Sequence, residues 1–375
     1  MGFALTGARV FDGVSFHDDL AVVVDGRHIT AIEPSSSLPT SIKRIELDGG
    51  VLAPGFIDVQ VNGGGGALLN DRPSVEVVNH IAEAHRRFGT TGLLPTVITD
   101  APHITRDAIA AVRAARGHGK AGILGIHVEG PFLDPKRRGA HDAAFIRAIT
   151  EADIQQFVAA DCGAFMLTVA PNCVSPQDIR RLVEGGVLVS LGHSDATYNE
   201  VKAALAGGAT SFTHLFNAMS QLTAREPGMV GAALADASFI GVIADGLHVH
   251  AVSLQLALSV ASADRFMLVS DAMPSAAGGP DHFMLQGRQV RRVGNRLTLP
   301  DGTLAGSNLT MDAALRYCVT ELNMDMATAL RMASANPARF LGLQNQLGLI
   351  APGALASLVH LDDNMNVTQT WVEGR

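Results

Sequence analysis

Residues 122–131 read GILGIHVEGP, a short apolar run that ends in polar and turn-forming residues. His127 and Glu129 stand where the apolar run gives way to a Gly-Pro pair. The same pattern recurs from about residue 51 to residue 348: a short apolar run, a polar end, and then a stretch with helical spacing. This alternation is typical of parallel strands that are linked by helices.

Eight such runs can be counted along the chain, and eight strands alternating with helices predict a (β/α)8 barrel. The alternative, an open doubly wound sheet, lacks the glycine fingerprint expected after its first strand. The VNGGGG of residues 61–66 has no Lys-Ser/Thr ending, so it indicates a tight turn. The runs are Gly55–Val61, Gly92–Ile98, Gly122–Val128, Ala164–Ala170, Val187–Leu191, Thr210–Leu215, Phe239–Ala244 and Phe266–Ser270. The helices expected between them include Val75–Phe88, Asp107–Arg116, Asp153–Ala160, Pro176–Glu184 and Asn199–Ala206.

Both ends of the chain read as short strands joined by turns. Asp-Gly pairs at residues 12–13 and 25–26 separate apolar runs, which is a strong hairpin signal. We therefore expect the ends to pair into one small β-domain of residues 1–52 and 349–375, which brackets a barrel of residues 53–348. The expected strands are Ala4–Val10, Leu20–Val24, His28–Ile32, Ser357–Leu361 and Val367–Val372.

The bulk composition excludes several classes of function. A formal net charge of −8 argues against nucleic-acid binding, and two short basic groups, Lys136–Arg138 and Arg291–Arg292, are interpreted as solvated loops. The 3 cysteines form no CxxC pair or disulfide framework, which favours a reducing compartment. No signal peptide and no apolar run of about 18 residues is visible. We expect a soluble, cytoplasmic protein that does not bind membranes.

The chemistry is expected at the carboxyl ends of the strands, because these ends form the active face of such barrels. Glu129, His193 and His214 each stand at the carboxyl end of one of the predicted strands. One carboxylate and two imidazoles suit Zn²⁺ or Fe²⁺ and leave a position for a water molecule, whose pKa the metal lowers. Any one of these histidines could be an ordinary core residue, but three such side chains at strand ends favour a metal site.

Asp271 directly follows the eighth run and is the candidate general base. The alternative is a helix N-cap, because Pro274 and Ser275 follow closely. His127 points to the same side of its strand as Glu129, so both a fourth ligand and a packing residue remain open. His141 follows a flexible loop and is either a substrate contact or an ordinary surface histidine.

Two further residues could hold a phosphorylated substrate. Arg225 lies in the loop after the sixth run, and His248 follows the seventh. A guanidinium matches phosphate oxygens, although an arginine in a loop is more often a surface charge. The residues alone thus indicate a metal-assisted hydrolase of a C–N or ester bond and leave its substrate open.

Several motifs together resemble one known family, and the likeness runs from Pro54-Gly55-Phe56-Ile57-Asp58 to Gly353. The chain is similar to the N-acetylglucosamine-6-phosphate deacetylases of the amidohydrolase superfamily. Pro-Gly-Phe-Ile-Asp alone would indicate only the superfamily. The motifs are His127-Val128-Glu129-Gly130-Pro131-Phe132, Gly192-His193-Ser194, Thr213-His214-Leu215-Phe216-Asn217-Ala218-Met219, Arg225-Glu226-Pro227-Gly228, Ala244-Asp245-Gly246-Leu247-His248 and Ser270-Asp271-Ala272.

The resemblance implies a barrel with a β-sandwich, a homodimer, and hydrolysis of the acetamide to glucosamine 6-phosphate and acetate in amino-sugar catabolism. It implies one divalent metal, with zinc preferred over iron, on Glu129, His193 and His214. It implies Asp271 as acid and base, with His141 beside it in catalysis. Some phosphate contacts would come from a partner subunit, and residues 304–306 would close over the sugar. The implied substrate contacts are Ala140, His141, Asn217, Ala218, Arg225, His248, Leu304, Ala305 and Gly306.

One departure from the superfamily pattern bears on the number of metals. Members commonly carry His-x-His at the end of the first strand, whereas this chain carries Gln60-Val61-Asn62. Amide side chains are poor zinc ligands, so we expect a single metal.

Two other functions remain as alternatives. Another amidohydrolase, acting on an N-acyl amino acid or a nucleobase, would need no phosphate contact, so Arg225→Ala would hardly change its KM. A catalytically inactive barrel, serving as a binding or assembly protein, would usually have lost metal ligands that this chain retains.

Overall fold

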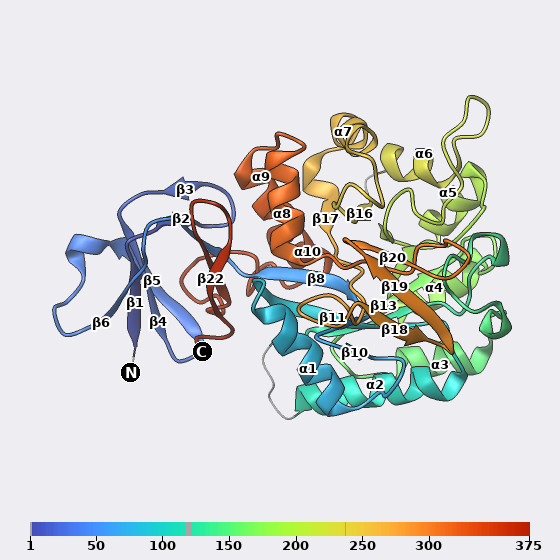
Figure 1. Cartoon of the computed structure of the whole chain (residues 1–375), viewed down its shortest axis with the longest axis horizontal. Helices are drawn as coiled ribbons and strands as arrows, with labels where there is room; N and C mark the ends of the chain where they lie inside the picture. The colour runs from blue at the N-terminus through green and yellow to red at the C-terminus, as the bar shows by residue number, and fades with distance from the viewer. Residues whose placement is uncertain (1, 118–121, 237) are drawn as a thin grey trace.

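The computed structural model describes residues 2–117, 122–236 and 238–375 (Figure 1). Eight parallel strands form one sheet, and they are neighbours in the same order as along the chain. Each strand falls on one of the eight predicted runs, so the barrel prediction is confirmed. The strands are β8 (Phe56–Val61), β11 (Thr90–Ile98), β12 (Gly125–Glu129), β13 (Ala164–Val169), β14 (Leu188–Leu191), β15 (Ser211–Phe212), β16 (Phe239–Val242) and β17 (Phe266–Leu268).

The last strand returns to the first, although no regular ladder joins them. β17 ends at Leu268, and the seam beyond it is closed by single contacts. The Asp271 N–H donates to the Gln60 carbonyl at 2.9 Å, and Val61 and Ala272 form an isolated parallel bridge. The buried Asp58 carboxylate accepts the Ser270 N–H at 3.2 Å. A side chain thus supplies part of the pairing that closes the barrel.

Ten α-helices are found in the described residues, and most of those between the barrel strands lie on the outside of the sheet (Figure 1). Helix starts follow ordinary capping rules: Thr150 and Thr197 form capping boxes, and Ser175 caps a helix whose first residue is Pro176. All five predicted helices are present. The helices are α1 (Val75–Arg86), α2 (Pro102–Gly117), α3 (Glu151–Val158), α4 (Pro176–Glu184), α5 (Tyr198–Ala206), α6 (Gly228–Ala235), α7 (Ala251–Val260), α8 (Met311–Thr320), α9 (Met326–Ala333) and α10 (Ala335–Phe340).

The terminal segments form a separate lobe, at the left in Figure 1, from two sheets. Apolar side chains from both sheets, among them Leu5, Val22, Leu52, Leu358 and Trp371, share one core cluster. Because β21 pairs with β7, the two ends of the chain meet as expected. One sheet contains β5 (His28–Pro34), β4 (Leu20–Asp25), β1 (Phe3–Thr6) and β6 (Lys43–Glu46). The other contains β22 (Val367–Trp371), β21 (Leu358–Leu361), β7 (Val51–Pro54), β2 (Arg9–Phe11) and β3 (Phe16–His17).

The domain limits remain a proposal: we place them at residues 1–52 with 349–375 for the lobe and 53–348 for the barrel. β7 crosses the first limit, so the chain passes between the units within a strand.

The prediction of one strand over Ala4–Val10 was wrong. β1 ends at Thr6 and β2 begins at Arg9, and the two strands belong to different sheets. Gly7, with φ of +87°, makes the crossing, because a Cβ there would lie 2.4 Å from the Leu47 carbonyl oxygen. A glycine inside an apolar run is the signal for such a break.

A third small sheet, which the sequence patterns did not predict, follows the barrel's last strand. It contains β18 (His282–Leu285), β19 (Arg288–Val293) and β20 (Arg296–Thr298). Arg291 and Arg292 therefore lie in a strand, and their interpretation as a solvated loop was wrong. Arg292 pairs with Asp281 and donates to the Asn308 side-chain oxygen at 3.1 Å.

The glycine run after β8 makes a turn, as expected. It connects the two-residue strands β9 (Gly63–Gly64) and β10 (Ala67–Leu68), and Gly65 and Gly66 both have positive φ. Within the described part of the chain, no helix is long and apolar enough to span a bilayer.

Candidate metal and acid–base site

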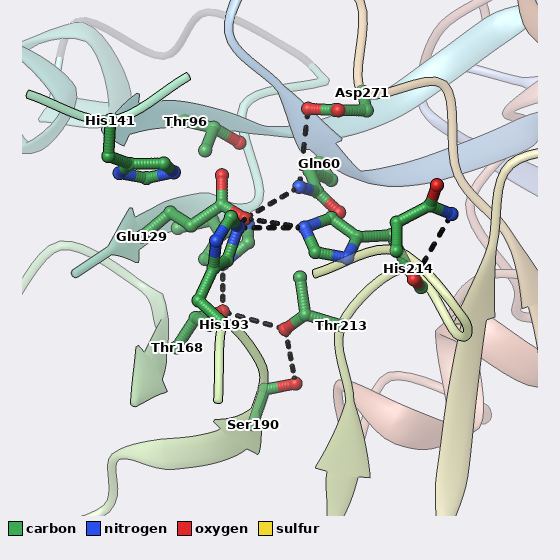
Figure 2. Close-up of polar contacts among 12 residues, drawn as sticks. Gln60, Thr96, Glu129, His141, Thr168, Ser190, His193, Thr213, His214 and Asp271 are labelled. Carbon is green, nitrogen blue, oxygen red and sulfur yellow. Dashed lines mark hydrogen bonds and ion pairs between the residues drawn. The ribbon is translucent and has the colours of Figure 1, made fainter. Parts of the chain in front are cut away.

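Three predicted ligands converge at the mouth of the barrel (Figure 2). Glu129 is the last residue of β12, and His193 and His214 follow β14 and β15. The Glu129 Oε1 atom lies 3.2 Å from the His193 Nε2 and 3.0 Å from the His214 Nε2. The two Nε2 atoms are 3.0 Å apart, and all three side chains are buried.

The donor set fits a divalent metal. The other ring nitrogen of His193, Nδ1, lies 3.0 Å from the Arg137 carbonyl oxygen, which can only accept a hydrogen bond. That contact places the proton of the neutral ring on Nδ1 and leaves the lone pair of Nε2 directed at Glu129. Carboxylate and imidazole lone pairs that face one another at about 3 Å require a shared cation or proton between them. The arrangement is a candidate metal-binding cluster of the kind that binds zinc or iron.

The electrostatics keep Glu129 ionised. Burial by itself would raise the pKa of this carboxyl. Hydrogen bonds from His193 and His214, together with electrostatic attraction to these rings, hold the pKa well below its usual range. Burial also opposes protonation of His214, yet the adjacent Glu129 carboxylate raises the pKa of that ring. The cluster thus contains an anionic carboxylate that attracts positive charge.

Asp271 faces the cluster from the seam between β17 and β8 (Figure 2). Its Oδ1 accepts hydrogen bonds from the Asn62 Nδ2 at 2.7 Å and from the Gln60 Nε2 at 3.2 Å. The same Gln60 nitrogen donates to the Glu129 Oε1 at 3.1 Å, so one amide joins the two carboxylates. Burial, followed by the charge of Glu129, raises the pKa of Asp271 to about 6. A carboxyl with that pKa is poised to take up and release a proton near neutrality.

The helix-cap alternative for Asp271 finds no support. In the described residues after position 271, no helix begins until α8, and residues 274–278 form a turn. Asp271 itself has φ of +51°. Its backbone is held by the Gln60 carbonyl on one side and the Ser307 N–H, at 2.8 Å, on the other. The strained conformation therefore aims the side chain at the site.

A cavity of about 380 Å³ opens at the cluster and contains twelve of the thirteen predicted site residues in its wall. Polar groups converge on one side of the cavity, and apolar side chains such as Ile98 and Leu285 line other parts. This combination is typical of a small-molecule site. The twelve residues are Glu129, Ala140, His141, His193, His214, Asn217, Ala218, His248, Asp271, Leu304, Ala305 and Gly306.

His141 is buried, so the alternative of a surface histidine does not hold. Its Nδ1 lies 2.8 Å from the Thr99 hydroxyl, and its ring packs edge-on against His193 with centroids 4.5 Å apart. Burial, followed by the neighbouring His193 ring, lowers the pKa of His141 to about 3, so the His141 ring is neutral.

Arg225 is the exception among the predicted residues. It lies in the exposed loop before α6 and does not line the cavity of its own chain. Within one chain, Arg225 therefore cannot contact a phosphate bound in the cavity, and its role as a phosphate contact stays a prediction.

His127 does not join the metal cluster. Its Nε2 lies 2.7 Å from the Thr168 hydroxyl, which continues through Thr213 to Ser190 in a chain of hydroxyls beneath the site (Figure 2). Two residues before Glu129 on the same face of β12, it lies deeper in the barrel. The contacts favour packing and support over ligation.

Lys136 and Arg137 were interpreted as part of a solvated loop; Lys136 is indeed exposed, but both residues also line the cavity, which was not predicted. Arg137 pairs with Asp195 at 2.8 Å and holds His193 through its carbonyl. Their closeness to the HVEGP motif was the available signal, but a backbone carbonyl leaves no trace in a sequence. Thr303 and Met273 also line the cavity without having been predicted.

The chain is similar to known proteins in both sequence and structure. Residues 51–375 match the model of the amidohydrolase family, and residues 2–52 match that of the NagA composite domain. The chain is 42% identical to the N-acetylgalactosamine-6-phosphate deacetylase of Shewanella sp. (strain ANA-3), over 98% of this chain and 94% of that protein. It is 33% identical to the N-acetylglucosamine-6-phosphate deacetylase of Haemophilus influenzae, over 100% and 99% of the two chains.

A solved structure shares the whole fold. The crystal structure of N-acetylglucosamine-6-phosphate deacetylase from Pasteurella multocida matches with a TM-score of 0.97 at 34% identity. The match covers 100% of this chain and 99% of the other.

Proposed function

The chain belongs to the amidohydrolase family and is a hydrolase acting on an amide, and from this we propose that it deacetylates N-acetyl-D-glucosamine 6-phosphate. The products are D-glucosamine 6-phosphate and acetate, and the reaction belongs to amino-sugar catabolism. One observation carries the proposal: Asp271, which lacks a metal-ligand role, shares a cavity of about 380 Å³ with the cluster of Glu129, His193 and His214.

The metal we propose is one Zn²⁺ per chain, with Fe²⁺ as the alternative, held by Glu129, His193 and His214. When bound, such an ion polarises the amide carbonyl and makes water more acidic. Gln60 and Asn62 present N–H groups toward Asp271, and this argues against a second ion at the seam.

Asp271 moves the protons of the reaction. Its carboxylate takes a proton as water attacks the acetamide carbonyl, and it then delivers that proton to the nitrogen as the C–N bond breaks. The two amide donors both contact Oδ1, and among the described residues no hydrogen bond reaches Oδ2. Oδ2 is therefore the oxygen we assign to proton transfer. Water adds across one amide bond, so acetate and a free amine account for all atoms.

The remaining cavity residues fit a sugar phosphate. His141, held by Thr99, reaches the acetamide or a sugar hydroxyl, and Asn217 and Ala218 lie beside the cluster. Residues 304–306 lie between β20 and α8 and form the outer wall over the sugar. His248 and, from a partner subunit, Arg225 are the proposed phosphate contacts.

N-acetyl-D-galactosamine 6-phosphate is a second candidate substrate. The Shewanella relative, 42% identical, is named for that sugar, and the Haemophilus relative, 33% identical, for the glucosamine compound. The two sugars differ only in the configuration of one hydroxyl-bearing carbon. Both need the same acetamide chemistry, so the cluster does not discriminate between them.

We propose that the protein is a homodimer. α7 carries Val252, Leu256 and Val260 at four-residue spacing, and their exposed fractions are 53%, 61% and 68%. Leu222, in the loop that also carries Arg225, is 58% exposed. Such apolar exposure marks association surfaces. A dimer that covers α7 is expected to become monomeric on Leu256→Glu in sedimentation, and an unchanged dimer would move the interface elsewhere.

A cytoplasmic location is also proposed. The cysteines, Cys162, Cys173 and Cys318, are all free, and this suits a reducing compartment.

The test of function is acetate release from the two 6-phosphorylated sugars, from N-acetylglucosamine, and from an N-acetyl amino acid. We expect turnover of a phosphorylated sugar that chelation abolishes and added zinc restores. The ratio of kcat/KM for the two epimers decides between the candidate substrates. Preference for the N-acetyl amino acid, or turnover that survives chelation, would refute the proposal.

A further inference from the structure

The third sheet (β18, β19 and β20) contributes to the wall of the active-site cavity from both of its edge strands. Leu285, the last residue of β18, lines the cavity. At the other edge, Leu304 bridges Thr298 of β20, and the Ala305 N–H donates to the Leu297 carbonyl oxygen at 3.2 Å. Because Leu304 and Ala305 also line the cavity, the position of this sheet sets part of the shape of the cavity.

The turn between β18 and β19 contacts the end of a barrel strand. It is a two-residue turn, Gln286–Gly287, in which both residues have positive φ, +51° and +77°. The Gln286 Nε2 donates to the Thr99 carbonyl oxygen at 2.6 Å and to the Asp100 Oδ2 at 3.0 Å. Positive φ is uncommon for a residue with a Cβ, and these two hydrogen bonds offset the strain. The turn is thus attached to the residues that directly follow β11.

Arg288 makes a second attachment, to the loop after β12. Its Nη2 donates to the Ala140 carbonyl oxygen at 2.6 Å and to the Gln286 Oε1 at 3.3 Å. Ala140 precedes His141 in the chain, and the Thr99 hydroxyl lies 2.8 Å from the His141 Nδ1. The two attachments therefore hold both neighbours of the His141 ring, one joined to it by the backbone and the other by a hydrogen bond.

The stability of the sheet alone does not require an arginine at position 288. The Arg288 Nε is buried and has no hydrogen-bond partner among the described residues. A buried N–H without a partner lowers the free energy of unfolding. A methionine would cover similar apolar surface without an unpaired N–H, but it could not hold the Ala140 carbonyl.

We infer that Gln286 and Arg288 are positioning residues that hold His141 against the substrate. The inference rests on the proposed function, in which His141 contacts the acetamide or a sugar hydroxyl. Neither Gln286 nor Arg288 lines the cavity, so both act through Thr99 and Ala140. A ring that is already fixed before the substrate binds loses less freedom in the transition state, and this raises the rate.

The same strand provides a matched control. Arg292 lies four residues after Arg288, on the same face of β19. It donates to the Asn308 side-chain oxygen at 3.1 Å and pairs with Asp281, and it does not line the cavity. Arg292→Met therefore removes comparable contacts from the same sheet without reaching His141.

The experiment is a double-mutant cycle between Arg288→Met and His141→Asn, with the zinc-loaded protein and the phosphorylated sugar. We expect Arg288→Met to lower kcat/KM about tenfold, with zinc content and the free energy of unfolding close to those of the wild type. In the His141→Asn background the same substitution should cause no further loss, because its effect passes through that ring. A residue with a merely structural role would lower turnover in both backgrounds.

Three further variants sharpen the test. Arg288→Lys keeps one donor for the Ala140 carbonyl and should restore most of the activity. Gln286→Asn suits the positive φ of the turn but is too short to reach Thr99, and it should lower kcat/KM a few-fold only when His141 is present. Arg292→Met should behave as wild type.

Four results would overturn the positioning role and leave the proposed function standing. They are an unchanged kcat/KM in Arg288→Met, an equal loss in both backgrounds, an equal loss in Arg292→Met, or wild-type turnover in His141→Asn. Absence of turnover of the phosphorylated sugar by the wild type would overturn both the positioning role and the proposed function.

Discussion

The two halves of the barrel mouth use carboxylates in opposite ways. On the side of β12, β14 and β15, Glu129 faces two imidazoles, and its pKa is held low. At the seam of β17 and β8, Asp271 faces two amides, and its pKa is raised to about 6. Imidazoles can release their protons and share a cation with a carboxylate, whereas amide N–H groups can only donate hydrogen bonds. The partners, not the carboxylates, decide which half binds metal and which moves protons.

Gln60 connects the halves, since its Nε2 contacts both Glu129 and Asp271. A neutral amide, and not a cation, therefore lies between the two carboxylates. The group that lies between the two carboxylates, here the Gln60 amide, determines that the proposed site holds one metal. A substitution in one half tests whether the other half responds.

The largest effect is expected from Glu129→Gln. The substitution removes the anionic ligand and leaves two imidazoles with an amide, which is a poor zinc site. We expect about one divalent ion per wild-type chain, almost none in the variant, and turnover lower by at least about 10³-fold. Elemental analysis with kinetics checks both. Two ions per wild-type chain would contradict the interpretation of Gln60 and Asn62.

Asp271→Asn should disable the other half alone. Asparagine has the same shape and can still contact its neighbours, but it cannot carry a proton. We expect normal metal content, KM within a few-fold of wild type, and kcat lower by about 10²- to 10³-fold. Near-normal kcat would exclude Asp271 as the proton carrier. Loss of the ion as well would mean that the halves are not separable.

Asn62→Leu should give a smaller and pH-dependent change. The Asn62 hydrogen bond lowers the pKa of Asp271, so its removal raises that pKa further above about 6. Because the base must be ionised, activity falls as pH falls through its pKa, and this acidic limb should move to higher pH in the variant. We expect kcat at neutral pH to fall by about two- to tenfold, with the metal retained.

The control for this change is Asn366→Leu, which removes an amide–carboxylate bond of 3.0 Å to Asp362 in the terminal lobe. Its pH profile should match that of the wild type. A profile of Asn62→Leu that also matches would show that the amide does not tune the base.

Much of this site could be predicted because strand ends carry a strong sequence signal. An apolar run that ends in His193 or Asp271 shows both where a strand stops and where its last side chain faces. The signal failed where geometry depends on the backbone or on another molecule. Nothing in the sequence shows that the Arg137 carbonyl orients His193, and Arg225 is exposed in a single chain.

The small sheet beyond β17 was missed for a different reason. β19 has the sequence RQVRRV, in which arginines outnumber apolar residues, so alternation gives little indication of a buried face. Leu285 and Val290 nevertheless pack with Ile98 and Met273 beside the cavity. A satellite cluster of this size is determined by tertiary contacts that no local pattern encodes.

The smallest effect on turnover, and the sharpest test of the seam, is expected from Asp58→Asn. Burial raises the pKa of Asp58 to about 7, although hydrogen bonds from Ser270 and Gln60 lower it. In the unfolded chain the carboxyl titrates near pH 4. Between about pH 4 and pH 7 the folded state therefore holds a proton that the unfolded state has released, so the free energy of unfolding falls as pH rises and levels off above about pH 8. Asparagine is neutral throughout and still offers one acceptor to the Ser270 N–H, so turnover should drop only a few-fold.

Denaturant unfolding from pH 4 to pH 9 measures the difference. Asp271 contributes a slope of the same sign to both proteins, so subtraction isolates Asp58. We expect the wild type to lose about 2–4 kcal/mol relative to Asp58→Asn across this window. Parallel curves of wild type and variant would mean that the Asp58 carboxyl is ionised in the folded protein at no cost in the free energy of unfolding. The contrast between a seam whose carboxyl pKa values are raised to about 6 and 7 and a metal half whose carboxyl pKa is lowered would then fail.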